Sequence, residues 1–202
     1  MAIPTLGITF RETMAGWFAL GESDPTTGQR KGQQEHSWLT IRPMVTIESL
    51  DRFQFHDRHA GKLKSTIHFP PLFGSAEPSG QGQFNLFARV GNTKLKLMLY
   101  EFSFVHDGER YFFSGKKNVE DDPGPDMWTD TTTLFSKLHK GADHKAPIIG
   151  SGILRITLPG FMRQLVSMRP TNCSNSREKL EVYLTFGNFF FGELWDSYVR
   201  RS

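Results

Sequence analysis

Cysteine is almost absent from this sequence. Cys173 is the single cysteine among 202 residues, so an intrachain disulfide is impossible and a reducing compartment is favoured. It lies in a polar segment, PTNCSNS, where we expect an inert thiol. The N-terminal segment MAIPTLGITFRETMAGWF lacks the basic residues and the unbroken apolar run of a secretory signal. We therefore expect a cytoplasmic protein.

Long apolar runs and clusters of basic residues are also missing. No apolar stretch approaches the length of a membrane span. The formal net charge is +3, but Lys and Arg are scattered along the chain, whereas nucleic-acid binders usually gather them in a stripe or a tail. We expect neither a membrane span nor a nucleic-acid partner.

The motifs of several enzyme classes are absent as well. SGQGQFN at residues 79–85 lacks the third glycine and the following helix of a dinucleotide fingerprint, and no G-x-S-x-G elbow occurs. His56 and His59, like His139 and His144, have no Cys pair or H-E-x-x-H helix beside them, so we interpret them as solvated loop histidines. We predict no catalytic residue, no metal site and no cofactor.

Phenylalanine, by contrast, is abundant, with 18 residues. Aromatic residues favour half-buried strands, and their rings either fill a core or line a cavity for a sterol or an acyl chain. The length of the chain suits one compact β domain over residues 1–202.

Strand patterns dominate the chain. GKLKSTIHF places Leu63, Ser65, Ile67 and Phe69 on one face, and Asp107-Gly108 separates two apolar-rich runs as a tight hairpin turn does. Gly91-Asn92 has the same pattern. Further strand candidates are GITFRETMAGWFAL, SWLTIRPMVTIESLDRF as two pieces joined at Pro43, TTTLFSKL, GILRITL and KLEVYLTF.

Helical spacing is confined to the end of the chain. Apolar residues recur at helical intervals over residues 159–166 and 191–199, whereas PTTGQRKGQQ has the composition of a polar loop. The sequence therefore predicts an all-β fold, an antiparallel sandwich or barrel, with one or two short helices near the C-terminus.

Charged residues gather between residues 115 and 130. Asp121, Asp122, Asp126 and Asp130 carry the hard oxygen atoms that Ca²⁺ prefers, but their spacing is not that of an EF-hand, and turn chemistry accounts for them. Lys116 and Lys117 either reach an anion or form a solvated strand edge, which is the usual case. Trp128 either closes one end of the β structure or rims a ligand pocket.

These segments also resemble a known domain. MLYEFSFVHDGERYFFSGKKNVEDDPGPDMWTDTTTLF, together with ITFRETMAGWF, TIESLDRF, GKLKSTIHFPPLFG and GILRITLPGFMRQLVSMRP, is similar to the accessory β domain found beside GMC-type flavin oxidoreductases of the cholesterol oxidase kind and beside some lipase-like enzymes. The resemblance spans most of the chain in matching order. It implies an accessory, non-catalytic role beside an oxidoreductase or lipase-like partner. Its recurring motif positions hold Glu12, Gly115, Lys116, Asp122, Trp128 and Asp130.

From these positions we select Glu12, Lys116, Trp128 and Asp130 as candidate ligand-binding residues. Aromatic content and the resemblance together point to a ligand-binding or interaction module for a hydrophobic molecule such as a sterol or lipid. Two alternatives stay open: a small enzyme acting on a lipid-like substrate in a barrel pocket, and a structural partner domain. A cavity with convergent ionisable groups favours the enzyme, whereas an exposed apolar patch favours the partner domain.

Overall fold

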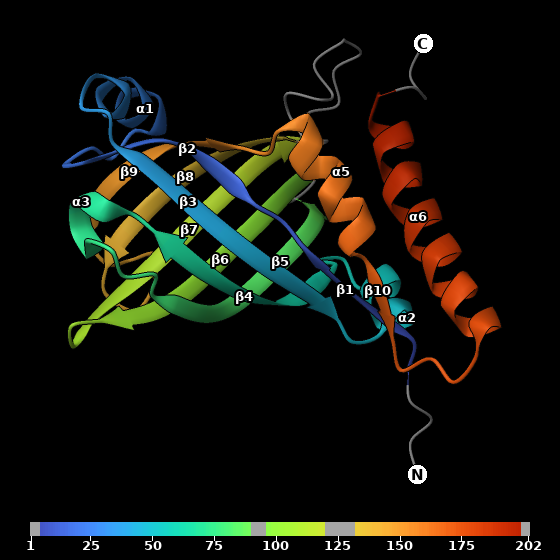
Figure 1. Ribbon diagram of the computed structural model, residues 1–202. Coiled ribbons are helices and arrows are strands. Elements are labelled where there is room, and N and C mark those ends of the chain that lie inside the picture. The colour runs from blue at the N-terminus through green and yellow to red at the C-terminus, as the bar shows by residue number, and fades with distance from the viewer. Residues whose placement is uncertain (1–4, 90–95, 120–131, 199–202) are drawn as a thin grey trace.

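The chain forms an antiparallel β-barrel, as predicted (Figure 1). The computed structural model describes residues 5–89, 96–119 and 132–198. Closure follows from the pairing of β3 with β4, which joins the two ends of the sheet. The strands of the barrel are β2 (Met14–Leu20), β3 (Trp38–Ile47), β4 (Ala60–His68), β5 (Ser79–Arg89), β6 (Lys96–His106), β7 (Glu109–Val119), β8 (Thr133–Lys140) and β9 (Ile148–Arg155).

Two consecutive strands share one edge of β3. β1 (Gly7–Arg11) pairs with the second half of β3, β2 pairs with its first half, and β10 (Arg169–Thr171) pairs with the outer edge of β1. The prediction that Pro43 joins two separate strand pieces within residues 37–53 is wrong, because β3 runs through Pro43. The carbonyl of Pro43 accepts a hydrogen bond from the Glu12 amide. The edge of β3 on which Pro43 lacks an N–H donor therefore faces the break between β1 and β2.

Inward-facing side chains form the core of the barrel. The predicted face of β4, with Leu63, Ser65, Ile67 and the following Phe69, is buried, which confirms that pattern. Aromatic rings pack together inside the barrel, with centroids 5.0 Å apart for Phe102 and Phe113 on adjacent strands and 5.2 Å apart for Phe18 and Phe69. In the described part of the chain, these inward rings pack against one another, so many of the phenylalanines serve as core.

The hairpin between β6 and β7 turns at Asp107-Gly108, as predicted. Asp107 has φ 49° and Gly108 has φ 77°, the pair of positive φ values that a two-residue turn of type I′ requires. The Gly91-Asn92 turn lies outside the described residues.

A helix replaces one predicted loop. PTTGQRKGQQ forms α1 (Pro25–Gln34), so the loop prediction there was wrong. The Asp24 carboxylate accepts a hydrogen bond from the Thr27 amide as an N-cap. Gly28 and Gly32 lie one turn apart and let the helix backbone approach the strands: a Cβ at Gly32 would overlap the backbone of Phe18 in β2.

The remaining helices are α2 (Leu50–Phe55), α3 (Pro70–Phe73), α5 (Leu158–Ser167) and α6 (Ser176–Tyr198). Of these, α2, α5 and α6 lie toward one end of the barrel, and α3 lies at the other end, on the side of α1 (Figure 1). The helices near the C-terminus were predicted, but α6 includes KLEVYLTF, so the strand prediction there was wrong. Val182 and Phe186 of α6 are buried, and the Phe186 ring centroid lies 5.9 Å from that of Phe10. Packing of these side chains therefore stabilises the segment as a helix. Within the described residues, no helix has the length and apolar character needed to cross a membrane.

Candidate ligand-binding cleft

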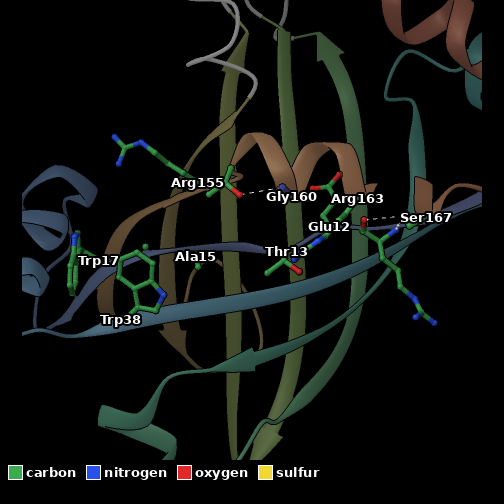
Figure 2. Close-up of a pocket in the computed structure, with 12 residues that line it drawn as sticks. Glu12, Thr13, Ala15, Trp17, Trp38, Arg155, Gly160, Arg163 and Ser167 are labelled. Carbon is green, nitrogen blue, oxygen red and sulfur yellow. Dashed lines mark hydrogen bonds between the residues drawn. The ribbon is translucent and has the colours of Figure 1, made fainter. Parts of the chain in front are cut away.

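A cleft opens on the outer wall of the barrel where β1 diverges from β2 (Figure 2). Its volume is about 490 Å³, and its walls come from β2, the start of β3, the end of β9 and helix α5. The residues that line it are Arg11, Glu12, Thr13, Ala15, Gly16, Trp17, Trp38, Arg155, Thr157, Gly160, Arg163 and Ser167.

Two tryptophans form one end of the cleft. Trp17 of β2 and Trp38 of β3 are directly opposite in the strand register, and their rings meet edge to face, with centroids 4.7 Å apart and an interplanar angle of 87°. Both side chains lie on the outer face of the barrel, because the neighbouring Phe18 and Leu39 point inward. Trp38 keeps 43% of its surface exposed, which leaves apolar ring surface open to the cleft.

Arginine side chains line the rest of the cleft. Arg155 ends β9 and Arg163 lies on α5, and both are exposed. In Figure 2, Arg155 lies on the tryptophan side of the cleft and Arg163 lies beside Glu12. Among the described residues, neither guanidinium has a carboxylate within ion-pair distance. The cleft therefore combines an apolar end with positive charge that has no protein counterion.

A buried polar network lies beneath the cleft. The Tyr100 hydroxyl donates to the Glu12 carboxylate, at 2.9 Å to Oε2. Gln164 Nε2 of α5 donates to Glu12 Oε1 at 2.6 Å, and Lys117 Nζ donates to the Tyr100 hydroxyl oxygen at 3.4 Å. The network thus joins four parts of the chain: β6 and α5 donate to the carboxylate at the break between β1 and β2, and β7 joins through the Tyr100 hydroxyl.

Burial controls the ionisation of this network. Lys117 is only 3% exposed, and desolvation lowers its pKa from the usual 10.5, although the negative charge of Glu12 acts in the opposite direction. Desolvation, reinforced by the charge of Glu12 and the hydrogen bond to it, raises the pKa of Tyr100 well above 10.0. Tyr100 is therefore a neutral donor at physiological pH, and its oxygen has a free lone pair for the lysine.

The structure separates the predicted ligand-binding residues. Glu12 lies at the floor of the cleft, whereas Lys116 is exposed on the outer face of β7 and lines a different groove. Trp128 and Asp130 lie outside the described residues, as do Asp121, Asp122 and Asp126. Lys117, not Lys116, reaches the Glu12 network, so the prediction of a solvated edge was wrong for Lys117.

Two features of the cleft were missed by sequence reasoning. The alternation of Tyr111, Phe113 and Gly115 along one face of β7 was the signal that could have placed Lys117 inside the barrel. No comparable signal marks Trp17 and Trp38, because their pairing depends on the register of β2 against β3.

The histidines divide into two kinds. His56 and His144 are exposed, as predicted, but His59 and His139 are buried, so the prediction of a solvated side chain was wrong for these two. His59 Nδ1 lies 2.9 Å from the carbonyl oxygen of Phe53. No group of three or more His, Cys, Asp or Glu side chains suited to a metal ion occurs in the described ranges.

Comparison of the chain with protein-family models, with curated proteins and with solved structures finds no match.

Proposed function

We propose that this protein is a ligand-binding module whose outer cleft holds, without catalysis in that cleft, an amphipathic, lipid-like molecule with an anionic group. The observation that carries the proposal is the Trp17–Trp38 pair, with Trp38 exposed and Trp17 half-buried, beside arginines that have no counterion among the described residues. The apolar part of the ligand covers the indole rings, and its anionic group reaches Arg155 or Arg163.

The physical chemistry of the cleft supports this ligand class. Its volume of about 490 Å³ lies within the range of small-molecule sites. Removing the exposed ring surface of Trp38 from water is favourable, at about 25 cal/mol for each Å² of apolar area. A guanidinium presents paired N–H donors that match a carboxylate or a phosphate, so the arginines select for an anion.

A role beside an enzyme is part of the proposal, as the resemblance to accessory domains of oxidoreductases and lipase-like enzymes implies. One observation favours a partner protein independently. Met162 and Val166 of α5 and Leu180 and Leu184 of α6 are more than half exposed, and such apolar side chains on neighbouring helices suit a protein contact. A purely structural partner domain is the second candidate, and it requires these helices without requiring the cleft.

A calorimetric titration with decanoate tests the cleft. Decan-1-ol is the uncharged counterpart, so the difference between the two affinities reports the contribution of the arginines. We expect Trp38→Ala to weaken decanoate binding about tenfold or more, a loss of about 1.4 kcal/mol. Arg155→Met combined with Arg163→Met should remove the preference for decanoate over decan-1-ol.

Arg110→Met is the matched control, because Arg110 is exposed at the start of β7 and does not line the cleft. Its decanoate affinity should equal that of the wild type. Decanoate affinity that is the same in the wild type and in Trp38→Ala would rule out the cleft as the binding site and leave the partner-domain candidate.

A further inference from the structure

A second groove lies on the outer wall of the barrel across β6, β7 and β8. Its volume is about 340 Å³, and it is lined by Pro25, Leu99, Glu101, Ser114, Gly115, Lys116, Phe135, Lys137, His139, His144 and Ile148. Ser114 points outward into this groove, because Phe113 and Gly115 on either side of it are buried inside the barrel.

Ser114 and His139 are hydrogen-bonded across the groove. The Ser114 hydroxyl lies 3.2 Å from His139 Nε2, and His139 Nδ1 lies 2.9 Å from the carbonyl oxygen of Ala146. A carbonyl oxygen can only accept, so in the neutral imidazole the proton is on Nδ1 and Nε2 carries the lone pair. The Ser114 hydroxyl is therefore the donor to Nε2, which is the direction in which a general base withdraws a proton from a nucleophile.

The imidazole is held in this orientation. His139 is only 3% exposed, and the ring of Phe112 meets it edge to face with centroids 5.7 Å apart. Ala146 is fixed in turn, since its amide donates to the Asp143 carbonyl at 3.1 Å and the Lys145 amide donates to the Asp143 carboxylate at 2.8 Å. The β8–β9 turn thus supplies the group that sets the tautomer.

Charged and apolar side chains surround the serine. Glu101 of β6 is directly opposite Ser114 on one side and also lines the groove. Lys137 of β8 is directly opposite Ser114 in the strand register, and Lys116 lies two residues further along the same face of β7. Cross-strand neighbours have Cβ atoms about 5 Å apart, so the ammonium of Lys137 can reach a charge that develops beside Ser114. Leu99, Phe135 and Ile148 give the same groove apolar surface.

We propose that Ser114 and His139 are the nucleophile and general base of a second site, which hydrolyses carboxylic esters with an apolar acyl group. This activity is separate from ligand binding in the outer cleft. The Ser114 oxygen attacks the ester carbonyl while its proton passes to His139 Nε2. The imidazolium then protonates the leaving alcohol, and an acyl-serine remains.

Water completes the reaction. His139 Nε2 removes a proton from a water molecule, the resulting hydroxide attacks the acyl-serine, and the carboxylic acid leaves as Ser114 regains its proton. Lys137 stabilises the oxyanion of both tetrahedral intermediates. The Ala146 carbonyl orients the imidazole but carries no full negative charge, so turnover should be slower than in a triad that contains a carboxylate.

A fluorophosphonate probe and p-nitrophenyl butyrate test the site in the full chain. We expect the probe to label Ser114, as located by tandem mass spectrometry of peptides, and hydrolysis of p-nitrophenyl butyrate to exceed the lysine-driven background. Ser114→Ala should lower turnover at least tenfold, and His139→Gln should abolish labelling of Ser114. Ser79→Ala, at an exposed serine of β5 outside the groove, should change neither result.

Mapping the label on the wild type needs no variant, so the test stands even if His139→Gln does not fold. A label found only on other residues, or turnover unaffected by Ser114→Ala, overturns the proposal. A single stoichiometric acylation of lysines without turnover overturns it as well, because nucleophilic lysines react in that way without a base-activated serine.

Discussion

Tyr100→Phe should destabilise the protein far more than the loss of one hydroxyl group normally does. The hydroxyl donates to Glu12 and accepts from Lys117, so its removal affects two buried charged groups at once. The phenyl ring keeps its packing against Phe84, at 4.9 Å between centroids, so no cavity forms. The effect therefore reports the hydrogen bonds alone.

The magnitude follows from the partners that remain. Glu12 keeps the hydrogen bond from Gln164, and Lys117 loses the hydroxyl that is its single hydrogen-bond partner among the described residues. A buried polar group without a partner, as Lys117 becomes, costs about 1 to 3 kcal/mol, and the hydrogen bond that Glu12 loses, being to a charged group, contributes about 1.5 to 3 kcal/mol. The expected loss in the free energy of unfolding is therefore about 2.5 to 6 kcal/mol. Release of the Lys117 proton moves the value toward the lower end, because a neutral amine is easier to bury.

Urea denaturation of Tyr100→Phe and Tyr111→Phe provides the measurement. Tyr111 is buried on the face of β7 that also carries Lys117, and its ring is stacked on Phe104. Its hydroxyl has no hydrogen bond within the described residues. We expect Tyr111→Phe to change the free energy of unfolding by less than about 1 kcal/mol. Adding Lys117→Met to Tyr100→Phe should recover part of the loss, because the unpaired ammonium is then gone. Equal losses in the two single variants would refute the reasoning.

Three further predictions concern stability. Gly108→Val should lower the free energy of unfolding by about 1 to 2 kcal/mol in thermal denaturation, because φ is 77° at this turn, whereas Gly108→Asn should cost less; equal losses would contradict the turn assignment. Gly32→Ala should lower the free energy of unfolding by about 2 kcal/mol or more, because the added Cβ displaces α1 from β2. Gly187→Ala on α6 is the control: its Cβ meets nothing within 4 Å, so it should be neutral or stabilising in the same assay. Burial lowers the pKa of Lys117 below 10.5, so between the folded-state pKa and 10.5 the unfolded chain binds more protons than the folded chain. The wild type should therefore gain stability relative to Lys117→Met as pH rises toward 10.5, whereas urea denaturation at a series of pH values would show a constant difference if the lysine were not desolvated.

Much of the barrel could be predicted from local sequence. The alternation along residues 61–69 identified the buried face of β4, and Asp107-Gly108 identified the turn between β6 and β7. Both signals depend on neighbouring residues only. The errors arose where contact decided the outcome. KLEVYLTF has the composition of a strand, yet it is helical because Val182 and Phe186 pack on one side of α6.

The candidate sites were harder to predict, because their members are distant in sequence. Glu12 was selected, but its hydrogen-bond partner Tyr100 is 88 residues away. Ser114 was not considered at all, since its partner His139 is 25 residues away on the next strand. Local patterns give the face on which a side chain lies but not the residue opposite to it.

The sequence by itself determined the antiparallel β class and the inward and outward faces of several strands, since a periodicity of two residues and turn residues are local properties. It also excluded an intrachain disulfide, since the chain has one cysteine. Tertiary structure alone decided the closure of β3 on β4, the close approach of α1 at Gly32 and the contact of Lys117 with Tyr100. Strand register decided which side chains meet, and it placed Trp17 beside Trp38 and Ser114 beside His139. Register depends on the packing of the whole sheet, and no short stretch of this chain contains that information.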